Sequence, residues 1–287
     1  MLGHKLYQRL SRDFRVFATI RGSFSDVEKF GIFNPESTIE HVDLANDGDI
    51  VRSIEFAKPN VVINAAGVIK QKPSSNDVIT TLSINSILPH KLAAFGSEHG
   101  FRTIIVSTDC VFKGTKGNYS ENDRADAEDL YGVSKKLGEL TGGNCLTLRT
   151  SIIGRELLTG HSLVEWLLSN RGESVKGFTR AIYSGFPTIV FTDIIYDLIL
   201  NFPKLSGLYH VSSNPIDKFN LLKLVNDAFD AKLKIEPDDS FVIDRSLNCE
   251  KFREATSFEP QPWEKMIELM ATDPTPYENW DQSASAI

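Results

Sequence analysis

Short apolar runs alternate with helical patterns through the first half of the chain. The apolar runs are residues 16–20, 61–65, 103–106 and 145–148. Runs of this length, apolar at successive positions, are typical of strands buried on both faces of a sheet. Helical spacing occupies the intervening segments 49–58, 84–95 and 130–140. This alternation predicts an α/β fold with a parallel, doubly wound sheet, which binds ligands at the carboxyl ends of its strands.

The second half of the chain has a less regular pattern. Helices are expected at residues 161–170, 189–200 and 221–229. We interpret most of this half as a smaller C-terminal α/β lobe that contacts the substrate. The predicted division is a dinucleotide-binding domain of residues 1–155 plus about 186–212, a substrate-binding lobe of about 156–185 plus 213–270, and a loosely held polar tail of 271–287.

The beginning of the chain lacks a feature that this fold requires. A doubly wound dinucleotide fold opens with a strand and a glycine-rich turn, whose backbone approaches the pyrophosphate at a helix N-terminus. Here Met1-Leu2-Gly3 matches only the end of a Gly-x-x-Gly-x-x-Gly turn. Two explanations remain open. Either the first strand and two glycines lie upstream of a shortened start, or the protein lacks that strand and its sheet has a central gap.

Composition narrows the class of protein. The net charge of −7 argues against nonspecific nucleic-acid binding. Three widely spaced cysteines and no His-x-x-x-His pair indicate neither a disulfide framework nor a metal site. No apolar run approaches the roughly 20 residues that span a bilayer, and the start lacks a signal peptide's apolar core. We therefore predict a cytoplasmic protein with neither nucleic-acid nor membrane partners.

Two short motifs carry the chemistry. Ser107-Thr108-Asp109 ends an apolar run, and Tyr131 precedes Lys135 by four positions, which places both on one helix face. A ketone that accepts hydride needs an acid and hydrogen-bond donors around its oxygen. Tyr131 can be that acid if the Lys135 ammonium lowers the phenol pKa, and Thr108 or Ser107 can supply a hydroxyl. Tyr-x-x-x-Lys alone is a weak motif, but its position after this strand favours catalysis over a surface pair.

A wider set of motifs resembles a known family, the extended short-chain dehydrogenase/reductases. The closest resemblance is to nucleotide-sugar reductases of the dTDP-4-dehydrorhamnose reductase type. The resemblance extends from Met1 to about residue 270, and its motifs occur in the family's order. These motifs are Asn64-Ala65-Ala66-Gly67, Ser107-Thr108-Asp109-Cys110-Val111-Phe112, Tyr131-Gly132-Val133-Ser134-Lys135 and Leu148-Arg149-Thr150-Ser151. The resemblance implies a Rossmann fold and an NAD(P)-dependent oxidoreductase that acts on a nucleotide sugar.

The resemblance also implies roles for individual residues. Tyr131 would donate a proton to the C4 carbonyl oxygen, Lys135 would hold the nicotinamide ribose, and Thr108 would hydrogen-bond the substrate carbonyl. The other implied cofactor contacts are Gly3, Asp43, Leu44, Ala65, Ala66, Gly67, Asn85 and Ser107. It gives no basis for a bound metal.

Charged residues suggest further contacts. Arg21 follows the second strand, where a basic residue suits the 2′-phosphate of NADP, so NADPH is expected over NADH. Arg149, Arg180, Lys70 and Lys72 could bind a nucleotide diphosphate through charge and hydrogen bonds. Asp109 completes the expected substrate contacts.

These residues together predict NADPH-dependent reduction of the C4 ketone of a nucleotide-linked 6-deoxy-hexulose, in deoxysugar and surface polysaccharide biosynthesis. Two alternatives remain open: a noncatalytic dinucleotide-binding regulatory subunit, like that of methionine adenosyltransferase, and a nucleotide-sugar epimerase. A homodimer is considered, but the sequence does not fix the oligomeric state, the nucleotide or the sugar.

Overall fold

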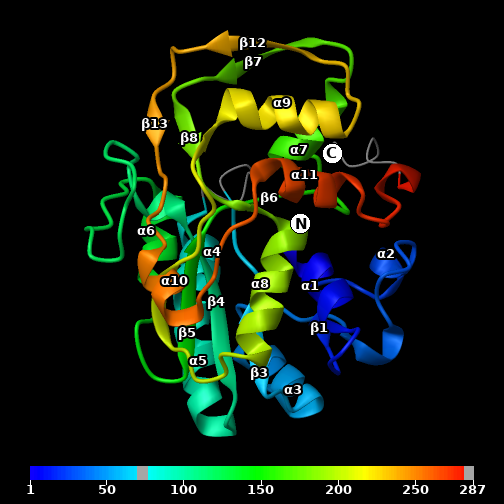
Figure 1. Ribbon diagram of the computed structural model, residues 1–287. Helices are drawn as coiled ribbons and strands as arrows, with labels where there is room; N and C mark the ends of the chain where they lie inside the picture. Colours follow the sequence, from blue (N-terminus) through cyan, green and yellow to red (C-terminus); the bar gives the residue numbers. More distant parts are fainter. Residues whose placement is uncertain (70–76, 281–287) are drawn as a thin grey trace.

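The computed structural model describes residues 1–69 and 77–280, and a parallel sheet lies at its centre (Figure 1). The sheet consists of β3 (Val61–Asn64), β4 (Arg102–Thr108), β5 (Cys145–Thr150) and β10 (Gly207–His210), in the order β10-β5-β4-β3. All neighbouring strands are parallel, with Ile104 opposite both Ile63 and Leu146. The predicted α/β class with a parallel sheet is confirmed.

The parallel strands do not form one continuous sheet. β1 (Ala18–Thr19) and β2 (Thr38–Ile39) pair with each other in a separate two-stranded sheet. Within residues 1–69 and 77–280, β3 pairs only with β4. One edge of β3 therefore has no strand beside it, at the place in the sheet where the sequence led us to expect a further strand.

Helices cover both faces of the central sheet. On one face, α1 (Leu2–Leu10) and α8 (Thr188–Leu200) bury apolar side chains against β4 and β5. On the other face, α3 (Asp47–Ala57) and α5 (Leu88–His99) form a second cluster around Phe101. None of the helices in the described ranges is long and apolar enough to cross a bilayer.

The helix expected at residues 84–95 is longer and less regular than predicted. It begins with α4 (Val78–Leu82), continues through a π-helical turn, η3 (Ser83–Ile87), and ends with α5 at Gly100, which has φ 76°. A left-handed residue at this position favours glycine. π-helical turns are often found at functional sites, and η3 contains Asn85.

A second group of elements lies beyond the carboxyl ends of the central strands, at the top of Figure 1. Short strands and helices build it: β6 (Ile152–Ile153), α7 (Leu163–Ser169), β7 (Ser174–Phe178), β8 (Ala181–Tyr183), β9 (Phe186–Pro187), β11 (Ile216–Asp217), α9 (Lys218–Ala228), β12 (Lys234–Asp238), β13 (Ile243–Asp244) and α11 (Trp263–Ala271). α10 (Glu250–Thr256) packs instead beside β10. The boundaries proposed from the sequence stay a prediction.

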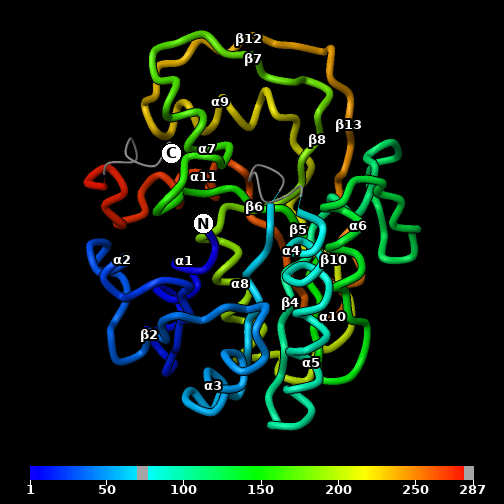
Figure 2. Tube along the Cα trace, turned by 180° about the vertical axis from the view of Figure 1, so that it is seen from behind, coloured from blue at the N-terminus to red at the C-terminus, as the bar shows by residue number. Residues whose placement is uncertain are grey.

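The C-terminal segment differs from the expected loose tail. Residues 273–280 pack on the first turns of α1, and Figure 2 shows the red and blue ends of the chain close together. The His4 Nε2 atom lies 2.6 Å from the Tyr277 hydroxyl, and the Lys5 Nζ atom lies 2.6 Å from an Asp273 carboxylate oxygen. The polar side chains that suggested a mobile tail instead form buried pairs. Residues 281–287 lie outside the described part of the chain.

His4 makes stability depend on pH. Burial lowers the pKa of its imidazole from 6.5 to about 2, so the folded protein keeps His4 neutral in mild acid while the unfolded chain takes up a proton. The free energy of unfolding therefore falls as pH drops below 6.5. Between pH 7 and pH 5 we expect the native protein to lose about 2 kcal/mol more than a His4→Gln variant.

Urea unfolding at the two pH values measures this difference. The matched control is His161→Gln, because His161 is exposed. That variant should keep the native pH dependence. Equal acid sensitivity of the native protein and His4→Gln would contradict the assignment.

Candidate active site

The three predicted catalytic residues meet at the carboxyl end of β4. Thr108 is the last residue of that strand, and its Oγ1 accepts a hydrogen bond of 3.1 Å from the Cys110 amide at the start of η4 (Asp109–Val111). The Tyr131 side chain, on α6 (Leu130–Leu137), hydrogen-bonds Thr108. Thr108 and Tyr131, which are far apart in the sequence, are therefore in contact in the structure.

Two local features place α6 against η4. Asp129 caps the helix, accepting a hydrogen bond of 3.0 Å from the Gly132 amide. A Cβ atom at position 132 would lie 2.4 Å from the Cys110 carbonyl oxygen and 2.5 Å from the Ala127 Cβ. Such distances are too short for any side chain, so glycine at 132 allows the close approach that brings Tyr131 to Thr108.

Burial shifts the pKa values of Tyr131 and Lys135 in opposite directions. It raises the pKa of the Tyr131 phenol above its ordinary value, and the nearby Cys110 thiol adds to the effect. It lowers the pKa of the Lys135 ammonium to about 8. The Lys135 Nζ donates a 2.7 Å hydrogen bond to the Val106 carbonyl, and its expected effect on the tyrosine pKa stays a prediction. Tyr131 is accordingly protonated at neutral pH, as a proton donor requires.

The structure adds Glu139, a residue that was not among those predicted from the sequence. Its carboxylate forms two hydrogen bonds of 2.7 Å with Arg149, from Nε and Nη2, and accepts a third of 2.7 Å from the Ser107 hydroxyl. Burial alone would raise the pKa of Glu139, but the Arg149 contacts outweigh it and hold the pKa below its ordinary range. The signal in the sequence was a third residue at helical spacing, four positions after Lys135.

Arg149 therefore has a different role from the one expected. Its guanidinium binds Glu139, its Nη1 lies 3.1 Å from His210 Nε2, and the residue is 2% exposed. Because its donors are engaged inside the protein, it is not placed to bind a nucleotide diphosphate. Arg180 lies exposed on the turn between β7 and β8. Lys70 and Lys72 lie outside the described residues.

Asp109 follows Thr108 directly and is buried. Burial raises the pKa of its carboxyl, and the charge of Arg245 opposes that rise. Arg245 comes from just after β13, and its Nε donates a hydrogen bond of 2.7 Å to the Phe112 carbonyl. No sequence pattern singles out Arg245, because its contact with the segment after η4 depends on how the second group of elements packs against the first.

The loop after β3 contains the expected cofactor residues Ala65, Ala66 and Gly67, and Asn85 braces it. The Asn85 Oδ1 accepts a hydrogen bond of 2.9 Å from the Val68 amide, and Nδ2 donates to the Val68 carbonyl at 3.0 Å and to the Ser134 hydroxyl at 3.1 Å. This side chain is 2% exposed. It therefore fixes the loop to η3 and to α6.

The other expected cofactor residues lie at element ends. Gly3 is exposed in the first turn of α1, where a Cβ atom would meet nothing within 4 Å. Arg21 is exposed after β1. After β2, Asp43 is exposed and Leu44 is half-buried. These positions stay predictions as cofactor contacts. Across residues 1–69 and 77–280, no group of three or more acidic, histidine or cysteine side chains could hold a metal ion.

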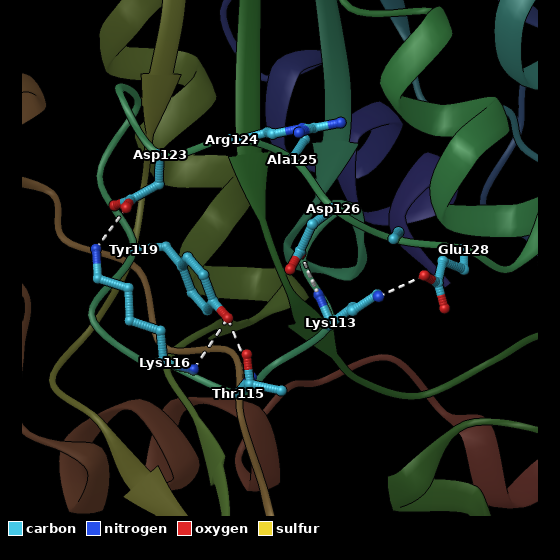
Figure 3. Close-up of a pocket in the computed structure, with 10 residues that line it drawn as sticks. Lys113, Thr115, Lys116, Tyr119, Asp123, Arg124, Ala125, Asp126 and Glu128 are labelled. Atoms are coloured by element: carbon cyan, nitrogen blue, oxygen red, sulfur yellow. Dashed lines mark hydrogen bonds and ion pairs between the residues drawn. The ribbon is translucent and has the colours of Figure 1, made fainter.

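The cavity drawn in Figure 3 is separate from these residues. It has a volume of about 660 Å³ and is lined by residues 113–128, without Thr108, Tyr131 or Lys135. Lys113 pairs with Glu128, and Lys116 pairs with Asp123. Since its principal charges pair within one loop, we do not assign the cavity to the active site.

The brace made by Asn85 has a measurable contribution to stability. Asn85→Ala removes three buried hydrogen bonds and leaves the Val68 amide and carbonyl without that partner. We expect the free energy of unfolding to fall by about 3 kcal/mol, measured by urea titration. The matched control is Asn122→Ala at an exposed position. A loss for Asn85→Ala no larger than for this control would contradict the role of the brace.

Comparisons with known proteins agree with this architecture. A dTDP-4-dehydrorhamnose reductase from Burkholderia thailandensis is 38% identical over 148 residues, which cover 50% of this chain and 44% of the relative. The alignment thus spans less than half of that relative's length.

Two solved structures have the same fold. A hypothetical dTDP-4-dehydrorhamnose reductase from Sulfolobus tokodaii gives a TM-score of 0.75 at 23% identity, covering 92% of this chain and 94% of the other. The Bacillus anthracis dTDP-4-dehydrorhamnose reductase, in complex with NADP, gives 0.73 at 21% identity, covering 89% and 98%. The family described as RmlD substrate binding domain matches residues 1–275. The chain therefore belongs to the RmlD substrate binding domain family.

Proposed function

We propose that this protein is an NADPH-dependent oxidoreductase that reduces the C4 ketone of a nucleotide-linked 6-deoxy-hexulose, as dTDP-4-dehydrorhamnose reductases do. The observation that carries the proposal is the Tyr131–Thr108 hydrogen bond at the end of β4, with Lys135 one helical turn away. Membership of the RmlD family and the named relatives support the same activity.

The described residues fit a dinucleotide in two respects. The first turn of α1 has no acidic residue and no side-chain cap, so its amides suit an anion. Gly3 leaves open space there. We assign cofactor contacts to Gly3, Arg21, Asp43, Leu44, Ala65, Ala66, Gly67, Ser107, Tyr131 and Lys135. The buried Asn85 acts through the loop that it holds in place. The exposed Arg21 and the relative solved with NADP favour NADPH over NADH.

In the proposed reaction, the two hydroxyls of the site receive the ketone oxygen. Bound NADPH supplies a hydride to the carbonyl carbon. Tyr131 gives its phenolic proton to the oxygen as the C=O double bond becomes a single bond, so the ketone becomes an alcohol. Thr108 donates a hydrogen bond to the same oxygen and limits the charge that develops there. Lys135 stabilises the phenolate left on Tyr131.

The same proposal includes a biological setting. The product would enter rhamnose or other deoxysugar synthesis for surface polysaccharide, in the cytoplasm where nucleotide sugars are made. Asp109 and Arg180 remain candidate substrate contacts, and a homodimer remains a candidate assembly. Light scattering of the purified protein measures the assembly.

Replacing the proton donor tests the activity. Tyr131→Phe removes the phenolic proton but keeps the ring, so we expect turnover of a dTDP-4-dehydro-6-deoxyhexose to fall by at least about a hundredfold. NADPH binding, followed by fluorescence, should remain. Tyr196→Phe is the matched control, because Tyr196 lies on α8 and packs on Arg9 and Phe14.

Three outcomes would contradict the proposal. Near-native turnover in Tyr131→Phe would remove Tyr131 from the chemistry. Native protein that binds a methionine adenosyltransferase stoichiometrically and turns over no ketosugar would favour the regulatory alternative. Dinucleotide retained through purification, together with interconversion of sugar epimers, would favour an epimerase.

A further inference from the structure

Glu139 lies at the junction of three elements below the proposed catalytic residues. It follows the last residue of α6 by two positions, and its side chain is 0% exposed. Its two main partners, Ser107 and Arg149, are directly opposite each other on β4 and β5. The carboxylate therefore ties the end of the catalytic helix to two neighbouring strands.

Gly138 allows this position. A Cβ atom at residue 138 would lie 2.1 Å from the Asn85 carbonyl oxygen, so only glycine permits the chain to pass so close to η3. The helix stops there, and the next residue turns its side chain toward the sheet. Glycine at 138 thus brings the Glu139 carboxylate under the strand ends.

Arg149 holds the carboxylate in a fixed orientation. The two parallel hydrogen bonds of 2.7 Å allow little rotation of either group. His210 supports the other side of the guanidinium, 3.1 Å from Nη1, while its Nδ1 lies 2.9 Å from the Tyr119 carbonyl. Burial lowers the pKa of His210 to about 4, so a neutral ring donates to Tyr119 and accepts from Arg149.

Glu139 also supplies a negative charge near Lys135. The Lys135 Nζ donates to the carbonyl of Val106, and the next residue of that strand, Ser107, donates to Glu139. Burial lowers the pKa of the Lys135 ammonium, and the Glu139 charge opposes that effect. Other charges face the helix less directly. From η4 come Asp109, whose pKa burial raises, and the Cys110 thiol. Within α4 and η3 no side chain is titratable. Arg102 lies at the opposite end of β4 and bonds the carbonyls of Leu198 and Leu205.

We propose that Glu139 is a positioning residue, which keeps Lys135 as an ammonium and fixes the Ser107 hydroxyl at the end of β4, and that Arg149 serves to hold Glu139. The contacts stand on their own, but the consequence for catalysis rests on the proposed reductase function. Glu139 touches none of the reacting atoms and acts through Lys135 and Ser107.

The variants must separate charge from folding. Glu139→Gln alone leaves the buried Arg149 without its counter-ion, which can unfold the protein. The double variant Glu139→Gln/Arg149→Met removes both charges and keeps similar volumes. Lys136→Gln is the matched control, because Lys136 also contacts Glu139, at 3.0 Å, but its side chain is 46% exposed. Circular dichroism confirms folding of each protein.

The first readout needs no substrate. Acetic anhydride acylates the uncharged amine, so the pH dependence of Lys135 acetylation, read by peptide mass spectrometry, gives the midpoint of its titration. We expect this midpoint to move down by about one pH unit in the double variant. Lys136→Gln should stay at the native midpoint. A folded double variant with the native midpoint would overturn the proposal.

The second readout connects the charge to turnover. With a dTDP-4-dehydro-6-deoxyhexose and NADPH, the fall of kcat at high pH should begin about one pH unit lower in the double variant, with little change in KM. An unchanged alkaline limb would overturn the catalytic role of Glu139. Native protein without turnover would count against the reductase function, while the acetylation midpoints would still decide whether Glu139 keeps Lys135 charged.

Discussion

The buried ion pair between Glu139 and Arg149 is the interaction on which the site depends. One end of it belongs to the segment that follows α6, and the other belongs to the central strand β5. Ser107 and His210 extend it to the strands on either side. A buried pair is costly to desolvate and is most valuable where it enforces one arrangement of its neighbours. Here it fixes the helix that carries Tyr131 and Lys135 to three strands.

The same enclosure has opposite effects on the two helix residues. Burial disfavours the charged form of every group, so it keeps the Tyr131 phenol neutral and weakens the hold of Lys135 on its proton. The proposed chemistry needs a protonated tyrosine and a charged lysine together. Burial provides the first condition and opposes the second. The negative charge of Glu139, four positions after Lys135, opposes the effect of burial on the lysine. This gives a reason for a carboxylate at a buried position.

Local sequence patterns were enough to predict the central strands and the closeness of Tyr131 to Thr108, because short apolar runs and helical spacing are properties of neighbouring residues. These patterns could not predict the role of Arg149, since its partners Glu139 and His210 come from the segment after α6 and from β10. The helical spacing of residues 130–140 correctly indicated α6, but it did not show that the apolar Val133 and Leu137 are 37% and 55% exposed. The C-terminal segment looked mobile because its polar residues find partners far away in the sequence, such as Lys5 on α1 and Arg155.

The position of His210 in the chain determines when the network around Arg149 can be completed. It is the last residue of β10, and it is synthesised well after the helix that carries Tyr131. Until β10 pairs with β5, the guanidinium of Arg149 lacks its contact with His210. A nascent chain that has emerged only as far as α8 already contains Thr108, Tyr131 and Lys135, yet it lacks the strand that closes the network around them. The network around these residues is therefore completed late in translation, when the central sheet receives β10.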